Sequence, residues 1–300
     1  MYIVEELYQL FYIIYTQFKL IFPFWITGLA IGSFISVFFA EKIAKIVEQI
    51  NPKKFYLLGV LSAAILGAAS PLCMYGTVPL IAVMGRKGTP QYFLVSFMVS
   101  SILINPNLFI YSFVLGVPIA LLRLFFSILA GVCAGILVHY CYKGKVFFDF
   151  ESFDGRKSLA KSHSLKGLLQ DIHKAIQITA PYFFIGILLA SLFEVFIPKM
   201  WIINLFGTNR ELGVLLAVSL GVPIYVCGGG TIPLMRGWLN TGMSPGAVIA
   251  FALSGASTKL TNLSAVKIIL GIKHFIAYIV FHMLFAILTG WLIDWIYRIF

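Results

Sequence analysis

Long apolar runs are the feature that most restricts how this chain can fold. Residues 117–141 contain one charged side chain, Arg123, and residues 274–297 contain one, Asp294. A helix needs about 20 apolar residues to cross the hydrocarbon core of a bilayer. Such runs recur along the chain, which is 60% hydrophobic and 11% charged, and a soluble domain of 300 residues could not bury so much apolar surface. We therefore expect an all-α polytopic membrane protein.

Uninterrupted and interrupted apolar runs alternate along the chain. The interrupted runs, 56–85 and 211–235, contain glycine, proline and threonine in mid-segment. The one sizeable polar segment, 143–171, is too short and too polar to fold alone, and we predict that it is a cytosolic linker. The uninterrupted runs, which are candidate spanning helices, are 20–40, 91–115, 117–141, 172–196, 246–270 and 274–297.

The linker separates two halves that resemble each other. CMYGTVPL at 73–80 matches CGGGTIPL at 227–234 with an offset of 154 residues, and PFWITG at 23–28 matches PYFFIG at 181–186 with an offset of 158. Two further matches follow in the same order. Matches in order at a nearly constant offset indicate internal duplication, which is how many transporters are built. The predicted units are a first membrane repeat, 1–142, the linker, 143–171, and a second membrane repeat, 172–300.

The distribution of positive charge favours inverted halves over parallel ones. If the interrupted runs cross the membrane, the chain has eight full spans, and lysine and arginine divide 11 inside to 8 outside. If each run enters and returns on one side, each half has three spanning helices plus a re-entrant hairpin, and the division is 15 to 4. Because these residues accumulate in cytoplasmic loops, we prefer the inverted arrangement and keep eight spans as the alternative. The same rule explains the net charge of +11 without a nucleic-acid partner.

The two interrupted motifs predict a substrate site inside the membrane. Glycine and proline disfavour helix interiors, so we expect non-helical backbone here, which needs protein or a wet cavity around it. Each threonine precedes a proline by two residues and is placed to cap a half-helix whose N-terminus suits polar or anionic substrates. Two such elements entering from opposite faces would meet near the midplane; the alternative is a kink used for packing. The residues are Cys73, Gly76, Thr77 and Pro79, and Cys227, Gly228, Gly229, Gly230, Thr231 and Pro233.

Polar residues in two neighbouring segments are expected to face the same site. Such side chains are costly in hydrocarbon unless they face the protein interior. Lys259 is the most costly, at roughly 2.5–3.5 kcal/mol on insertion scales. It either has a function, as a charge partner or a gate, or extends its ammonium group to the membrane surface. Arg123 lies nearer a segment end and is expected to snorkel, and His282 either packs or relays protons. The predicted binding residues are Asn105 and Asn107 in SSILINPN and Ser257, Thr258, Lys259 and Asn262 in SGASTKLTN.

The cysteine and acidic residues limit the chemistry that the chain can perform. Cys73 and Cys227 occupy equivalent positions, where their sulfurs either contact a soft ion or metalloid or serve as small packing residues. The four cysteines lack metal-finger spacing, so we predict no metal site. The sequence contains no phosphate-binding loop for ATP and no acidic residue at mid-membrane for a proton relay. We predict no cofactor and no enzyme activity.

The paired motifs resemble those of a known family. SPLCMYGTVPL at 70–80 and GVPIYVCGGGTIPL at 221–234, with GAST following, are similar to the bacterial predicted permeases that include the organoarsenical efflux permease ArsP. The resemblance covers nearly the whole chain. It implies a multi-pass secondary permease of the bacterial inner (plasma) membrane, usually drawn with eight spans. For the best-known branch it implies export of trivalent organoarsenicals, with Cys73 and Cys227 as the metalloid contacts.

The leading interpretation is a secondary transporter whose halves rock about a midplane site. Its partners would be the lipid bilayer and a small-molecule substrate, a trivalent organoarsenical or a related soft molecule; the oligomeric state is left open. A channel-like passive pore is one alternative, because hairpins that meet at the midplane also suit conduction. An intramembrane thiol-dependent enzyme is the other, with only His282 and Lys259 to serve Cys73 and Cys227 as acid–base partners.

Overall fold

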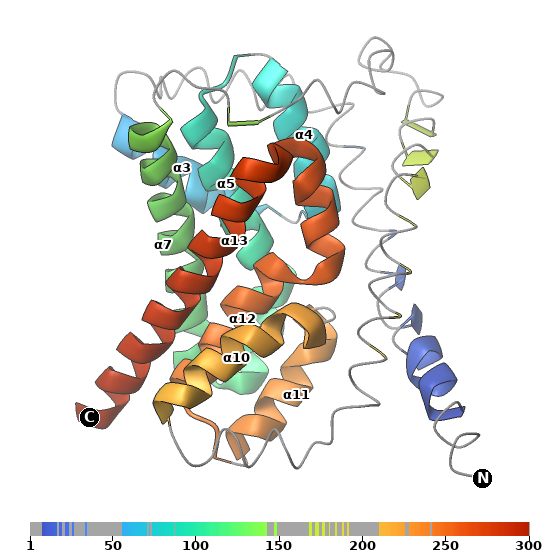
Figure 1. Ribbon diagram of the computed structural model, residues 1–300, viewed down its shortest axis with the longest axis vertical. Helices are drawn as coiled ribbons and strands as arrows, with labels where there is room; N and C mark the ends of the chain where they lie inside the picture. The colour runs from blue at the N-terminus through green and yellow to red at the C-terminus, as the bar shows by residue number, and fades with distance from the viewer. Residues whose placement is uncertain are drawn as a thin grey trace.

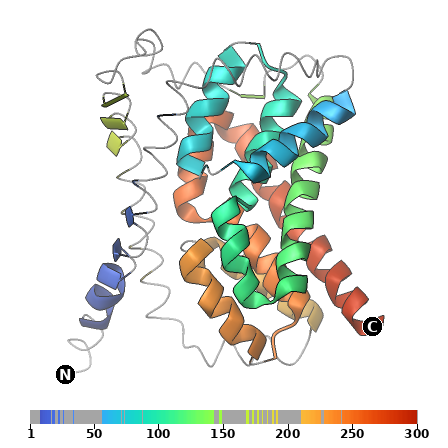
Figure 2. The same cartoon turned by 180° about the vertical axis from the view of Figure 1, so that it is seen from behind.

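The computed structural model describes residues 56–142 and 210–299 except positions 71, 73, 87, 226, 227 and 241. It also describes 8–16, 147–148 and scattered positions within 18–34 and 168–191. In these parts all regular structure is helical, and the helices form a bundle (Figures 1 and 2). The elements that position the site are α3 (Tyr56–Ala69), α4 (Met74–Arg86), α5 (Gln91–Leu103), α6 (Pro106–Ser112), the 3-10 helix η2 (Phe113–Leu115), α7 (Val117–Cys141), α10 (Arg210–Ile224), α11 (Gly228–Asn240), α12 (Pro245–Thr258) and α13 (Leu260–Ile299).

Among the described residues, two helices are long and apolar enough to cross a membrane unaided. One is α7, with 25 residues, and the other is the 31-residue part of α13 from Ile269 to Ile299. The sequence predictions of helices at 117–141 and 274–297 are therefore confirmed. A third candidate span consists of α5 with the residues Leu108–Leu115, joined at an angle of 46°.

The uninterrupted span predicted at 91–115 is wrong, because the chain breaks between α5 and α6. Ile104 and Asn105 both have extended backbone angles, with ψ of 145° and 168°. Asn105 precedes Pro106, and the proline ring disfavours a helical conformation in the residue before it. The Asn105 side chain then accepts a hydrogen bond from the Leu108 amide and starts α6.

The uninterrupted span predicted at 246–270 is also wrong. Helix α12 ends at Thr258, and Lys259 has a non-helical ψ of 145°. The hydroxyls of Ser257 and Thr258 donate to main-chain carbonyls of the preceding turn, a bonding pattern that bends helices. Within α13, Gly271 has a φ of 63°, which divides that helix again. The predicted spans 20–40 and 172–196 fall almost wholly outside the described residues.

Both interrupted runs are broken, but the break precedes the motif. Helix α3 ends at Ala69 and α4 begins at Met74, while α10 ends at Ile224 and α11 begins at Gly228. The expectation of non-helical backbone through the motifs is therefore wrong. A proline this close to a helix start removes one backbone hydrogen bond, and the helix continues past it. The motif residues inside helices are Gly76, Thr77 and Pro79 in α4, and Gly228, Gly229, Gly230, Thr231 and Pro233 in α11.

Element bounds recur between the two halves. Helices α4 and α11 are offset by 154 residues at both ends, and so are the positive-φ turns at Gly88 and Gly242. Helix α3 packs against α5 and α7, as α10 packs against α12 and α13. Helices α3 and α4 lie at the upper end of the bundle and α10 and α11 at the lower end (Figures 1 and 2). The two broken pairs therefore occupy opposite ends.

The core lies where the halves meet. Helix α12 packs against α5 and α7, α11 packs against α6 and η2, and α13 packs against α4 and α7. The side chains of α12 are buried from Gly246 to Thr258, and those of α5 from Phe93 to Leu103. Helices that are apolar on every side belong inside a bundle, and α5 and α12 are the central pair.

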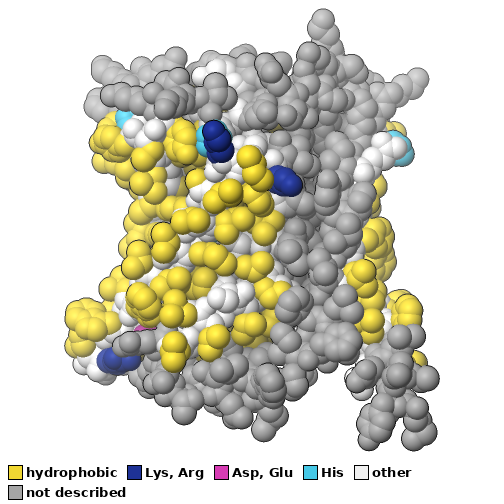
Figure 3. All heavy atoms as spheres, in the orientation of Figure 1, with side chains coloured by type: hydrophobic (Ala, Val, Ile, Leu, Met, Phe, Trp, Pro, Cys, Tyr) yellow, Lys and Arg dark blue, Asp and Glu magenta, His cyan; other side chains and the backbone are white. Residues whose placement is uncertain are grey.

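The outer surface of the described residues is apolar around the middle of the bundle. Hydrophobic side chains cover this band, and lysine and arginine lie toward the ends (Figure 3). Helix α13 exposes apolar side chains at every fourth position, which places them on one face. An apolar surface of this extent marks contact with lipid, so the bundle is that of a membrane protein. The exposed residues of this face are Ile276, Val280, Leu284, Leu288 and Leu292.

Glycines allow the helices of each half to approach closely. A Cβ atom on Gly135 of α7 would lie 2.9 Å from Val60 Cγ1 in α3, and one on Gly290 of α13 would lie 2.6 Å from Val214 Cγ1 in α10. Val60 and Val214 are themselves offset by 154 residues. Because lipid tails are as apolar as leucine, helices in membranes associate through such close packing of small residues.

We expect Gly67→Ala to destabilise the protein and Gly237→Ala not to. The added methyl at Gly67 would meet the backbone of α5 at the Phe97 carbonyl and the Ser101 amide, whereas nothing lies within 4 Å of the same position at Gly237. Overpacking costs about 1–3 kcal/mol, while alanine in an open helical position gains up to about 1 kcal/mol over glycine. The melting temperatures of the two purified variants, compared with that of the wild-type protein, measure both changes in stability. Equal melting temperatures would contradict the close approach of α3 and α5.

Candidate substrate site

A cluster of hydroxyl groups surrounds the first helix break. Ser101 Oγ, in α5, lies 2.8 Å from Thr77 Oγ1 and 3.2 Å from Ser70 Oγ. It also approaches the Leu72 carbonyl at 3.4 Å. One hydroxyl of α5 therefore contacts two residues of the break and one residue of the helix that follows it. The expectation that Thr77 caps α4 is wrong, because Thr77 is the fourth residue of that helix and is fully buried against Ser101.

A second polar cluster lies where α12 gives way to α13. Ser257 Oγ donates to the Leu253 and Ser254 carbonyls at 2.9 and 3.0 Å, and Thr258 Oγ1 donates to the Ser254 carbonyl at 2.6 Å. Tyr278 Oη donates to the Ser257 carbonyl at 3.0 Å. The donors of these predicted binding residues are therefore engaged within the protein, and a ligand would meet their oxygens as acceptors.

Two polar atoms of this second cluster have no hydrogen-bond partner among the described residues. They are Asn262 Oδ1 and His282 Nε2, both buried. The other ends of the same side chains are held: Asn262 Nδ2 donates to the Ala256 carbonyl at 2.7 Å, and His282 Nδ1 lies 2.8 Å from the Tyr278 carbonyl. An unpaired buried polar atom is costly, so a water or ligand that bonded to either atom would be bound favourably.

Asn105 and Lys259 occupy the two additional helix breaks. The carbonyl oxygen of the Asn105 side chain accepts from the Leu108 amide at 2.9 Å, so it serves as a helix cap. Lys259 is half-buried at the C-terminal end of α12, where the partial negative charge of a helix end favours an ammonium group. Lys259 therefore sits at a helix end, and the sequence prediction had placed it within a continuous span.

Several predicted site residues cannot be placed further. Cys73 and Cys227 lie outside the described residues, each one position before the first residue of α4 or α11. Leu72 and Met74, on either side of Cys73, are 1% and 3% exposed. Thr231 is buried in α11. Asn107 lies in α6, and its surroundings are not described, as is also the case for the glycines and prolines of the two motifs.

Arg123 was expected to snorkel, and this expectation is wrong. The side chain is 1% exposed. Its Nη1 donates to Ser112 Oγ at 2.9 Å and its Nη2 donates to Tyr225 Oη at 3.1 Å. Tyr225 follows α10 directly and is the first residue of the second break. The long helix of the first half is therefore hydrogen-bonded to the break of the second half.

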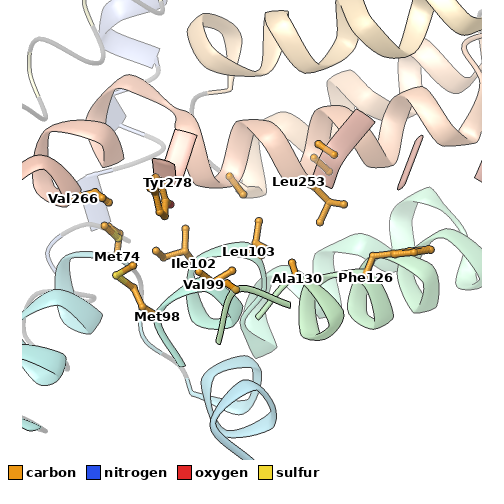
Figure 4. Close-up of a cluster of buried hydrophobic side chains, with 14 of the residues drawn as sticks. Met74, Met98, Val99, Ile102, Leu103, Phe126, Ala130, Leu253, Val266 and Tyr278 are labelled. Carbon is orange, nitrogen blue, oxygen red and sulfur yellow. The ribbon is translucent and has the colours of Figure 1, made fainter. Parts of the chain in front are cut away.

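Helix α4, which directly follows the first break, packs in turn against α13, the long helix of the second half. Met74 of α4 lies in one cluster with Met98 of α5 and with Val266 and Tyr278 of α13 (Figure 4). Arg123 and Tyr278 are offset by 155 residues, close to the offset of the motifs. The sequence analysis did not identify Tyr225 or Tyr278. For Tyr278 the offset of 155 residues was a usable signal, because it pairs this tyrosine with Arg123, the one charged residue of 117–141.

We expect Tyr225→Phe to destabilise the protein by about 1.5–3 kcal/mol, the range for a hydrogen bond to a charged group. The variant removes only the hydroxyl that Arg123 Nη2 contacts. Tyr111→Phe is the control, because Tyr111 is 41% exposed. Chemical or thermal unfolding in detergent provides the measurement, and the same loss in both variants would argue against a bond between the halves.

Relatives of this chain include proteins from two bacteria and an archaeon. The protein named "Putative two-component membrane permease complex subunit" of Streptococcus mutans serotype c is 23% identical over 256 residues, or 82% of this chain and 81% of the relative. UPF0718 protein YcgR of Bacillus subtilis is 22% identical over 246 residues, covering 80% and 82%. UPF0718 protein MJ0584 of Methanocaldococcus jannaschii is 22% identical over 138 residues, covering 46% and 38%.

No solved structure matches the chain. The family model ArsP_1, described as "Predicted permease", matches residues 6–295. This match includes the two motifs and the helix break beside each of them. The chain therefore belongs to the ArsP_1 family of predicted permeases.

Proposed function

We propose that this protein is a secondary transporter with its substrate site near the middle of the membrane, between the two helix breaks. The observation that carries this proposal is that each broken pair of helices contacts the long helix of the other half. Tyr225 is hydrogen-bonded to Arg123 of α7, and Met74 of α4 clusters with Tyr278 of α13 (Figure 4). Because of these crossed contacts, a movement of one half against the other alters both breaks together, as alternating access requires.

The topology that we propose has inverted halves with re-entrant broken pairs. Helices α3 and α4 have 14 and 13 residues, or about 20 Å each at 1.5 Å per residue. Neither would cross a hydrocarbon core of about 30 Å alone. In an eight-span chain the two would instead join end to end, whereas here both lie at the same end of the bundle (Figures 1 and 2). The 15-to-4 division of positive charge supports the same topology.

This topology predicts which loops are accessible from the cytoplasm. In a cysteine-free background, Lys87→Cys and Gly144→Cys should react with an impermeant thiol reagent from the cytoplasmic side. Thr241→Cys, offset by 154 residues from position 87, should react from the opposite side. Labelling of intact cells and of everted vesicles measures the difference. Labelling of positions 87 and 144 from opposite sides would establish the eight-span alternative.

The substrate that we propose is a trivalent organoarsenical or a related soft small molecule. Cys73 and Cys227 directly precede the first residues of α4 and α11, and the N-terminal end of a helix favours a thiolate. Thiolates and thioethers select soft ions. Met74 and Met98 bring two thioethers close to the first break (Figure 4), which supports a soft lining on that side.

Transport by cysteine variants tests the proposed function. Everted vesicles that contain the wild-type protein should accumulate trivalent methylarsenic, and Cys73→Ser and Cys227→Ser should each abolish most of this uptake. Cys133→Ser is the matched control, because Cys133 is half-buried in α7 and belongs to neither motif. Unchanged uptake in both motif variants would remove the metalloid-contact role. Saturable flux with counterflow supports a transporter, whereas ohmic single-channel current would support the passive pore.

The assay should begin in native membranes. The Streptococcus mutans relative is named as a subunit of a two-component permease complex, and by that analogy we propose that this chain can also act with a second subunit. A partner of this kind would be lost on purification. Activity in native vesicles that disappears in proteoliposomes and returns when membrane extract is added would support a partner; full activity of the purified chain would exclude the need for one.

A further inference from the structure

Arg123 carries a positive charge that no described residue neutralises. Arginine stays protonated in proteins, and this side chain is 1% exposed. Both of its hydrogen bonds go to neutral hydroxyls, those of Ser112 and Tyr225. Within the described ranges no carboxylate lies at ion-pair distance from it. Asp294, the one acidic side chain whose surroundings are described, is engaged at the start of α12 by Ser244 Oγ and the Gly246 amide.

Two buried donors near this charge lack hydrogen-bond partners. Arg123 Nε has none among the described residues, and neither has Ser127 Oγ. Ser127 lies four residues further along α7, on the same helix face as Arg123. A buried charge in a membrane protein normally has a counter-charge, and a guanidinium with an unused N–H presents the planar donor fork that suits an anion.

We propose that Arg123 is the centre of an exchangeable small-anion site between the two halves of the protein. Ser112 and Tyr225 hold the two Nη atoms of the guanidinium in place, and the unpaired Nε–H is the donor that remains for the anion. The ligand is monovalent, because one buried guanidinium balances one negative charge and a second negative charge would again be unpaired. Halides and small carboxylates such as formate are small anions that carry one negative charge.

The site connects to the transport mechanism through Tyr225. This residue lies two positions before Cys227 and three before the start of α11, so an anion at Arg123 lies beside the second break. The inference rests on the proposed function only where it gives the anion a role in transport. In that role the anion is a co-transported ion or the acidic group of the substrate. Binding of the anion does not depend on which solute is carried.

Thermal unfolding of the full-length protein in nanodiscs tests the site. The protein is prepared in sodium gluconate, whose anion is too large for the site, and gluconate is replaced stepwise by chloride or formate at constant ionic strength. We expect a saturable rise of a few degrees in the melting temperature of the wild-type protein. Sulfate should give a smaller rise, because it is divalent. A wild-type protein that shows no saturable rise with either monovalent anion would overturn the proposal.

Variants separate the site from general salt effects. Arg123→Gln should abolish the rise, and Arg123→Lys should retain part of it because the charge remains. Arg236→Gln is the matched control: Arg236 is exposed and donates to the Val114 carbonyl, and its loss should leave the rise intact. A rise in Arg123→Gln equal to that of the wild type would refute the site. If Arg123→Gln does not fold, equilibrium dialysis with radiolabelled chloride compares wild type with Arg123→Lys, and equal affinity refutes it.

The two proposals fail independently. Cysteine-dependent uptake of methylarsenic without any anion-dependent stabilisation would overturn the anion site and leave the transporter. Anion-dependent stabilisation that requires Arg123, together with no transport of any tested solute, would support the site and count against the proposed function.

Discussion

A chain inside a bilayer must satisfy its backbone hydrogen bonds within the protein, and in this molecule the helix breaks are where that requirement is hardest to meet. Ser101 meets part of it at the first break, where its hydroxyl contacts Thr77, Ser70 and the Leu72 carbonyl. At the end of α12, Tyr278 from α13 supplies the corresponding donor to Ser257. These two breaks are therefore held by side chains from other helices, and those helices must be in place before the breaks are stable.

The central pair α5 and α12 connects these supports. Both helices are buried along almost their full length, and both end at residues with extended backbone angles. The chain then turns to a short helix in the first half and to the first part of α13 in the second. Polar groups that follow the central helices consequently lie inside the bundle, although the neighbouring sequence is apolar. This arrangement explains how a 60% hydrophobic chain holds buried hydroxyl, amide and guanidinium groups in its interior.

Sequence reasoning predicted the helices that depend on local composition and missed the features that depend on contacts between distant residues. The helix at 117–141 follows from its apolar length, and a break in each motif-bearing run follows from glycine and proline. The displacement of these breaks to positions before the motifs does not follow, because a helix tolerates Pro79 and Pro233 once its first turn is held. The break at Asn105 had a local signal in Asn105-Pro106; the break at Lys259 had none, since it depends on hydroxyl bonding in the last turn of α12.

The candidate site shows the same division. Asn262 was identified from its cost in hydrocarbon and Thr77 from its place in the first motif, and both are buried and hydrogen-bonded. Arg123 was misplaced, because distance from a helix end predicts snorkelling only when no partner is available nearer the centre. Its partner Tyr225 lies 102 residues away in the chain, and no local pattern links the two. Pairing of this kind becomes visible only when both halves are assembled.

That separation has a consequence for biogenesis. A ribosome that has delivered α7 to the membrane has made Arg123 and Ser112 but must still synthesise residues 142–225 before Tyr225 emerges. During that interval the guanidinium has one of its two protein partners. The first half is therefore an unfinished insertion intermediate rather than an independent module, and a truncated chain that ended in the linker would expose a charged residue to the cell's membrane quality control.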